Sequence, residues 1–76
     1  MEVTVNIIER LGAIGETNRR GFTRELNIVS WNGGKPKLDI RDWDGDHERM
    51  TRGIALWEDE ARKLNELLTE YFKEAE

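Results

Sequence analysis

The 76-residue sequence contains no cysteine, and this absence excludes several classes of protein at once. Disulfide bridges, thiolate zinc sites, iron–sulfur clusters and thiol nucleophiles all require cysteine. A chain this short buries only about 60% of the surface that its unfolded form exposes, so a lone copy is marginally stable. Since disulfides are excluded, we expect association with a second copy to supply the missing stability.

The sequence also lacks a long hydrophobic run, a targeting signal and the common catalytic motifs. No apolar stretch approaches the roughly 20 residues that cross a membrane, and the first residues lack the basic and apolar regions of a signal peptide. A glycine-rich phosphate loop and a Ser-His-Asp set are both missing. We therefore expect a soluble, cytoplasmic protein with no catalytic activity and no membrane partner.

Charge is unevenly distributed along the chain, whose formal net charge is −4. Residues 1–56 carry nine basic and nine acidic side chains, whereas residues 57–76 carry three basic and seven acidic ones. The C-terminal segment therefore holds the whole net charge. This division predicts a solvated acidic element at the end of the chain and a functional surface in the neutral part.

Hydrophobic periodicity predicts a single domain over residues 1–76, with four strands and one helix. A period of two predicts strands over residues 2–14, 22–31, 36–43 and 50–56. A bulge is expected near Ile7 and Ile8, and Asn32-Gly33-Gly34 predicts a tight turn. After Leu56 the period changes to about 3.6, which predicts a helix over residues 58–74. The expected fold class is α+β, a four-stranded meander followed by one long C-terminal helix.

The predicted helix carries an apolar stripe that one small sheet cannot bury completely. Its members share one face of the helix: Ala61, Leu64, Leu67, Leu68, Tyr71, Phe72 and Ala75. We expect a homodimer whose interface contains Leu64, Leu67, Leu68, Tyr71 and Phe72. The alternative is that the apolar stripe of the helix binds in a groove on a different protein.

The third predicted strand carries the strongest functional signal. One face presents alternating side chains, namely Lys35, Lys37, Asp39, Arg41 and Trp43, while Leu38 and Ile40 point to the core. Cations interleaved with aromatic rings are typical of binding to single-stranded nucleic acid. Nearby residues would extend this surface: Arg20, Phe22, Arg24, Trp31, Arg49 and Arg52. The alternative is an ordinary solvated basic face with Trp43 in the core or at an interface.

The register of the second predicted strand stays open, because alternation gives two answers. Leu26 and Ile28 assign one face to the core, whereas Val29 and Trp31 assign the other. A bulge in this strand would reconcile them. Trp31 is therefore either a core residue or a platform for a base.

An acidic run before the fourth predicted strand resembles a calcium loop only in part. Its carboxylates alternate at Asp42, Asp44, Asp46 and Glu48. A calcium loop starting at Asp42 needs glycine at its sixth position and glutamate at its twelfth, where this chain has His47 and Gly53. His47 is the only histidine. We expect a polar loop here, with no metal and no cofactor.

Several segments resemble bacterial YdbC-type members of the positive cofactor four family of single-stranded-DNA-binding transcriptional coactivators. The resemblance spans about residues 2–72 and rests on residues 25–32 (ELNIVSWN), 36–43 (PKLDIRDW), 47–50 (HERM) and 52–56 (RGIAL). It implies a curved sheet and a homodimer whose channel takes single-stranded DNA with little sequence preference, in transcription, replication or repair. It also implies a location in the bacterial nucleoid.

The resemblance matches four positions of this chain to residues of the family, and the chain departs from the family at two places. Lys35 matches a lysine of the family's turn, Arg41 and Trp43 match residues of its third strand, and Arg52 matches a cation before Gly-Ile. The departures are Asn32-Gly33, where relatives carry an aromatic residue and a lysine, and Trp57, where they carry a helix cap. RNA is an alternative ligand. A protein-interaction adaptor that acts through the helix or a sheet edge is the alternative function.

Overall fold

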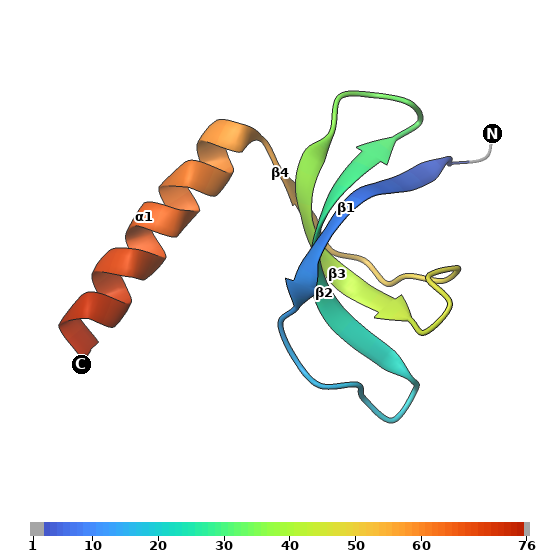
Figure 1. The fold of residues 1–76 in the computed structure, drawn as a ribbon, viewed down its shortest axis with the longest axis horizontal. Helices are drawn as coiled ribbons and strands as arrows, with labels where there is room; N and C mark the ends of the chain where they lie inside the picture. Colours follow the sequence, from blue (N-terminus) through green and yellow to red (C-terminus); the bar gives the residue numbers. More distant parts are fainter. Residues whose placement is uncertain (1–2, 76) are drawn as a thin grey trace.

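The structure is a computed structural model that describes residues 3–75, with side chains through residue 73. Its elements are β1 (Val5–Ala13), β2 (Phe22–Trp31), β3 (Lys37–Asp44), β4 (Ile54–Leu56) and α1 (Glu58–Ala75). The strands form one antiparallel sheet in the order β1-β2-β3-β4 (Figure 1). The predicted α+β meander with a C-terminal helix is confirmed. The predicted start of the first strand, at Glu2, lies outside the described residues. The side chain of Ala75, a member of the predicted apolar stripe, lies outside the described side chains.

The irregular strand is β1, whose pairing with β2 shifts register after Ile7 and again after Arg10. The bulge predicted near Ile7 and Ile8 is confirmed. The bulge considered for the second strand is wrong, because β2 pairs with β3 without interruption. Regular alternation in β2 therefore puts Val29 and Trp31 on the face opposite Leu26, and the extra residues of β1 accommodate the bend.

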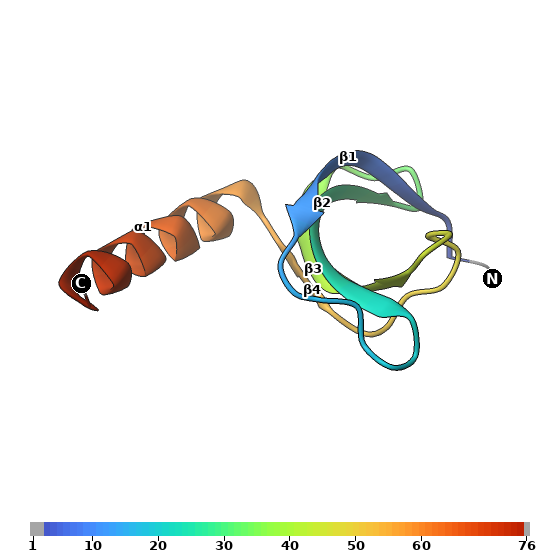
Figure 2. The same ribbon diagram turned by 60° about the horizontal axis from the view of Figure 1, so that its bottom comes forward.

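The sheet curls strongly, so its two faces differ in burial (Figure 2). We call the concave face the inner face; it carries the odd-numbered residues of β2 and β3, from Thr23 to Trp31 and from Lys37 to Trp43. Val29, Asn27, Asp39 and Trp43 are buried on it. The curvature brings these side chains together, so they cover one another.

The opposite, outer face carries Leu26, Ile28, Leu38, Ile40, Ile54 and Leu56. Leu38 and Ile40, predicted as the core face, are only half-buried, whereas the predicted exposed face is the more buried one. That prediction was wrong because alternation identifies which residues share a face but not the direction of the curl. The first half of α1 lies beside the outer face and its second half projects beyond the sheet (Figures 1 and 2).

The fourth strand is shorter than the predicted residues 50–56. Met50 forms an isolated bridge with Trp43, and the regular ladder begins only at Ile54. Between them, the hydroxyl of Thr51 accepts the backbone N–H of Asp42 at 3.2 Å. This side-chain hydrogen bond replaces a ladder bond and interrupts the strand.

The connections follow local chemistry. Asn32 and Gly33 have φ values of 51° and 71°, as the predicted tight turn requires, and Gly34 N–H donates to Trp31 C=O at 2.8 Å. The helix begins at Glu58, as predicted, and ends at Ala75, one residue beyond the predicted end. The Glu60 carboxylate accepts the Trp57 backbone N–H at 2.8 Å, which is one half of a capping box and compensates for the missing cap side chain.

Candidate nucleic-acid interface

Arg41, predicted to bind phosphate, is occupied by contacts within the chain. Its Nε and Nη2 donate to the two carboxylate oxygens of Asp39 at 2.6 and 2.8 Å. The Asp39 side chain is fully buried and that of Arg41 is 11% exposed. A third donor, Nη1, reaches Thr51 C=O at 3.3 Å. Arg41 therefore connects β3 to the segment before β4 through hydrogen bonds. Because its guanidinium is already paired with a carboxylate and a carbonyl, it has little capacity to bind a phosphate.

The inner-face tryptophans are also covered. Trp43 is 4% exposed and its ring centroid lies 5.8 Å from that of His47. Trp31 is half-buried, with the Arg41 guanidinium carbon 4.5 Å from its ring centroid. Stacking on a base requires an accessible ring. Burial of Trp43 weighs against its predicted place on a nucleic-acid-binding surface and favours the alternative of a core residue. Trp31 combines partial burial with a cation–π contact.

A polar cluster fills the end of the inner face near Trp43. His47 Nε2 lies 2.9 and 3.0 Å from the two carboxylate oxygens of Glu25, and Glu25 also accepts Asn27 Nδ2–H at 3.1 Å. His47 reaches this position with a φ of 57°, a left-handed conformation. Within the described residues, Asn27 Oδ1 and the indole nitrogens of Trp31 and Trp43 have no hydrogen-bond partner. A water molecule or ligand at these atoms would gain hydrogen bonds that the chain itself leaves unmade.

The loop after β3 is organised by Asp44. Its Oδ1 accepts the backbone N–H groups of Glu48 at 2.9 Å and of Arg49 at 3.0 Å. The Arg49 N–H is the largest cause that lowers the pKa of Asp44 below its usual value of 3.8. Burial opposes this effect, while the Glu48 N–H and the Arg49 cation reinforce it. This carboxylate therefore has a defined structural role in holding the loop.

Exposed cations lie at both ends of the sheet. Lys35 is exposed before β3, and Lys37 at the start of that strand is half-buried. At the other end, Arg20 and Arg52 are exposed, and Arg49 is 81% exposed with its Nε 3.6 Å from Asp44. Among the described residues, no carboxylate lies within ion-pair distance of the lysine pair. These cations, rather than Arg41 with its contacts inside the chain, are accessible to phosphates.

Two predicted DNA-binding residues lie on the other face. Phe22 and Arg24 belong to the outer-face alternation of β2, where they pair with Asp44 and Asp42. Arg24 Nε donates to the Asp42 carboxylate at 2.9 Å, although the arginine side chain is 63% exposed. The fold therefore does not bring these two residues together with Trp31, Lys37 and the rest of the inner face.

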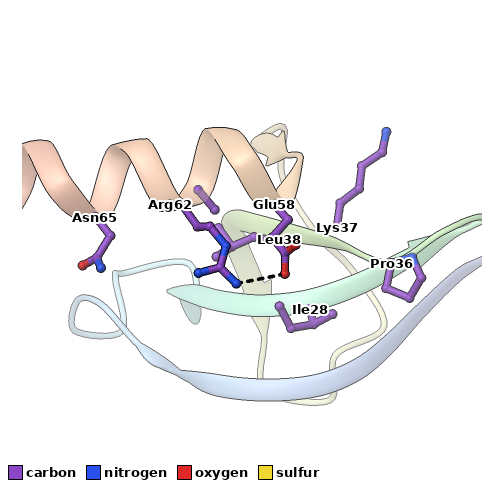
Figure 3. Close-up of a pocket in the computed structure, with 8 residues that line it drawn as sticks. Ile28, Pro36, Lys37, Leu38, Glu58, Arg62 and Asn65 are labelled. Carbon is purple, nitrogen blue, oxygen red and sulfur yellow. Dashed lines mark hydrogen bonds and ion pairs between the residues drawn. The ribbon is translucent and has the colours of Figure 1, made fainter.

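Two of the grooves beside the sheet contain charged side chains that bear on ligand binding. One has a volume of about 500 Å³ and opens at the mouth of the inner face, lined by Val3, Val5, Asn6, Ile7, Arg10, Trp43, Asp46, His47, Glu48 and Met50. The other runs between α1 and the sheet, where Arg62 and Glu58 point toward one another while Lys37 extends away (Figure 3). The first is lined by one arginine, Arg10, and two carboxylates, Asp46 and Glu48. It is therefore less suited to phosphates than the exposed ends of the sheet.

The predicted dimer residues on α1 are mostly uncovered in one copy of the chain. Leu67, Leu68, Tyr71 and Phe72 are between 47% and 64% exposed, whereas Leu64 is half-buried beside the outer face. Tyr71 and Phe72 contact each other edge to face at 5.1 Å between ring centroids. A contiguous apolar surface of this kind is typical of an interaction site.

The acidic run does not form a ligand cluster. Asp42 pairs with Arg24 and Asp44 binds backbone N–H groups, so the carboxylates do not converge. Among the side chains that the structure describes, those of residues 3–73, no group of three or more His, Cys, Asp or Glu is placed to hold a metal ion. In the same part of the chain, no helix is long and apolar enough to span a membrane.

The sequence reasoning missed two features of this region. The first is the Asp39–Arg41 pair, whose signal was available, because opposite charges two residues apart on one strand face can meet. The second is Trp57, which is 48% exposed and has Lys37 Nζ 4.2 Å from its ring centroid. The sequence pattern identifies Trp57 only as a poor helix cap, whereas its position opposite Lys37 follows from the register of β3 and β4.

Comparison with known proteins gives two matches. A family model described as Transcriptional Coactivator p15 (PC4) matches residues 19–67, which include β2, β3, β4 and the first ten residues of α1. An uncharacterised protein of Treponema pallidum (strain Nichols) is 40% identical over 52 residues, which make up 68% of this chain. The match covers 61% of that relative, so the chain spans about three fifths of its length.

Proposed function

This chain belongs to the transcriptional coactivator p15 (PC4) family, a family of single-stranded-DNA-binding proteins, and on that premise we propose that it binds single-stranded DNA without catalysis. We further propose little sequence preference, a homodimeric assembly, and a role in transcription, replication or repair in the compartment that holds the DNA. The family match over residues 19–67 is the observation that carries the proposal. The subgroup of bacterial YdbC-type members stays a prediction.

The exposed cations support this function. Lys35, Lys37, Arg49 and Arg52 are distributed along the ends of a curved sheet, and phosphates of an extended strand can meet cations at such spacing. The acidic residues in the second half of α1 do not conflict with this, because that half projects away from the sheet (Figure 1). Electrostatic binding of this kind carries no sequence information, which agrees with low sequence preference.

Fluorescence anisotropy with labelled oligo(dT) in low salt tests the proposal directly. We expect binding at micromolar protein or below, weaker binding to a duplex of equal length, and a linear fall of log affinity with log salt. Lys35→Ala should reduce the salt slope by about one, because one phosphate contact is lost. Lys63→Ala is the matched control, since this lysine lies on α1 and pairs with Glu66 at 3.5 Å. Absence of binding by the wild-type protein would refute the function.

One observation favours a second candidate, a protein-interaction adaptor. The exposed apolar residues of α1, from Leu67 to Phe72, could receive a foreign helix in place of a second copy. An adaptor without DNA affinity would leave the anisotropy of labelled oligo(dT) unchanged. The same titration therefore separates the two functions.

A further inference from the structure

The three tryptophans differ sharply in their access to a ligand. Trp43 is 4% exposed and Trp31 is half-buried beneath the Arg41 guanidinium, whereas Trp57 is 48% exposed. Bases of single-stranded nucleic acids stack on accessible aromatic rings whatever their sequence. Among the three tryptophans, Trp57 is thus the most exposed residue.

Trp57 is held firmly at the junction of β4 and α1. Its backbone N–H donates to the Glu60 carboxylate at 2.8 Å, and its C=O accepts the Ala61 N–H at 2.9 Å. Both contacts belong to the first turn of the helix. A ring on an ordered backbone loses less conformational freedom when a ligand binds, which favours affinity.

Cations accompany the exposed ring. Lys37 Nζ lies 4.2 Å from the ring centroid of Trp57, and Lys35 is exposed two residues earlier in the chain. Figure 3 shows Lys37 extending away from Ile28 and Leu38, the outer-face residues of the groove beside it. An aromatic platform flanked by ammonium groups has the two elements that a nucleotide of a single strand requires.

The acidic side chains beside Trp57 limit the side from which a phosphate can approach. Glu58, Asp59 and Glu60 form the first turn of α1; Glu58 lies 3.5 Å from Arg62, and Glu60 binds the Trp57 N–H. These carboxylates repel a phosphate that approaches from the helix side. The backbone of a bound strand is thereby directed toward Lys35 and Lys37.

We propose that Trp57 and Lys37 form a stacking site for one unpaired base, with Lys35 and Lys37 neutralising the adjoining phosphate. The inference rests on the proposed function and adds a binding position to it. It assigns the stacking role to Trp57, in place of the buried Trp43.

Two substitutions of Trp57 test the site. Trp57→Leu should weaken binding of labelled oligo(dT) by between about fivefold and about a hundredfold, the range for one base stacked on an aromatic residue. Trp57→Phe keeps an aromatic ring and should retain most of the affinity. In both variants the salt slope should stay close to that of the wild-type protein, because no cation is removed. Circular dichroism and urea unfolding of each variant check that the fold is intact.

Intrinsic fluorescence gives an independent measurement. Oligo(dT) should quench the wild-type emission, and Trp57→Phe should remove most of this quenching, since Trp43 is buried and Trp31 is half-buried beside the Arg41 guanidinium. Equal affinity and equal quenching in the Trp57 variants, with the wild-type protein still binding, would overturn the site and leave the proposed function standing. Failure of the wild-type protein to bind would overturn both. A change of oligomeric state in Trp57→Leu that accounts for the whole affinity loss would assign Trp57 to a subunit interface and also overturn the site.

Discussion

Arg41 connects three parts of the inner face, because it pairs with Asp39, covers Trp31 and donates to Thr51 C=O. Arg41→Ala leaves a fully buried carboxylate without its cation, and breaking such a pair costs about 3–5 kcal/mol. We expect the free energy of unfolding, measured by urea denaturation, to fall by that amount. Arg24→Ala is the control, because the Arg24 side chain is 63% exposed and its pair with Asp42 should contribute about 1 kcal/mol or less. Equal losses in the two variants would contradict this assignment.

Single-residue roles were the least predictable part of the sequence. Arg41 and Trp43 were correctly placed on one strand face, yet Trp43 is buried and the Arg41 side chain is only 11% exposed. The pattern of a strand states which side chains are neighbours but not which way a sheet bends. Because the curvature decides whether a face is open or filled, charge and ring type alone could not separate a ligand-binding face from a core.

At the scale of elements, the segment before β4 depends on Gly53. A Cβ at this position would overlap the Ile40 carbonyl oxygen and the Arg41 Cβ, so the two backbones can approach only without a side chain. Gly53→Ala should therefore force the segment away from β3 and cost about 1–3 kcal/mol in the free energy of unfolding. Gly45→Ala is the matched control, since its Cβ would meet no atom within 4 Å. Urea unfolding of both variants measures the difference, and an unchanged stability of Gly53→Ala would contradict the packing.

The loop of residues 45–49 should make stability depend on pH through Asp44. Its native pKa is lowered, so the carboxylate stabilises the fold above its unfolded pKa near 3.8 and this contribution is lost as the pH falls through the lower native pKa. Asp44→Asn should destabilise the protein at pH 6. The gap between variant and wild type should narrow as the pH falls below about 4. Urea midpoints from pH 6 to pH 2 provide the test, and a gap independent of pH would contradict it.

Elements themselves were well predicted where local signals agreed. The residue range of β2, the left-handed Asn32-Gly33 turn and the start of α1 at Glu58 all follow from periodicity and turn chemistry. The length of β4 did not follow, because the Thr51 hydroxyl and the Arg41 guanidinium take positions that a regular ladder would need. Side-chain hydrogen bonds of this kind depend on the tertiary structure, which the hydrophobic pattern does not encode.

For the whole molecule, one copy of the chain leaves much apolar surface uncovered. Besides α1, Ile8, Leu11, Ile14 and Ile54 are between 46% and 57% exposed. Of these residues, Ile14 lines a further groove between the helix and the outer face, together with Leu26, Ile40 and Leu64. The length and composition predict that this surface is covered by association, because a short chain without disulfides buries too little apolar surface to be stable alone. We therefore retain the homodimer as a prediction in which the outer face and α1 of two copies cover one another.

Leu68→Asp tests that assembly. Leu68 is 47% exposed and lines the groove, so a second copy would bury it, and an unpaired carboxylate there should raise the dimer dissociation constant at least about a hundredfold. Thr69→Asp introduces the same charge one position away, off the apolar stripe, and should leave the dimer intact. Sedimentation velocity over a range of protein concentrations measures both. If the Leu68→Asp protein is monomeric and binds oligo(dT) more weakly, the DNA strand contacts both subunits of the dimer. If the monomer binds with the wild-type affinity, the binding site lies within one subunit. A Leu68→Asp protein that dimerises like the wild type would place the interface elsewhere.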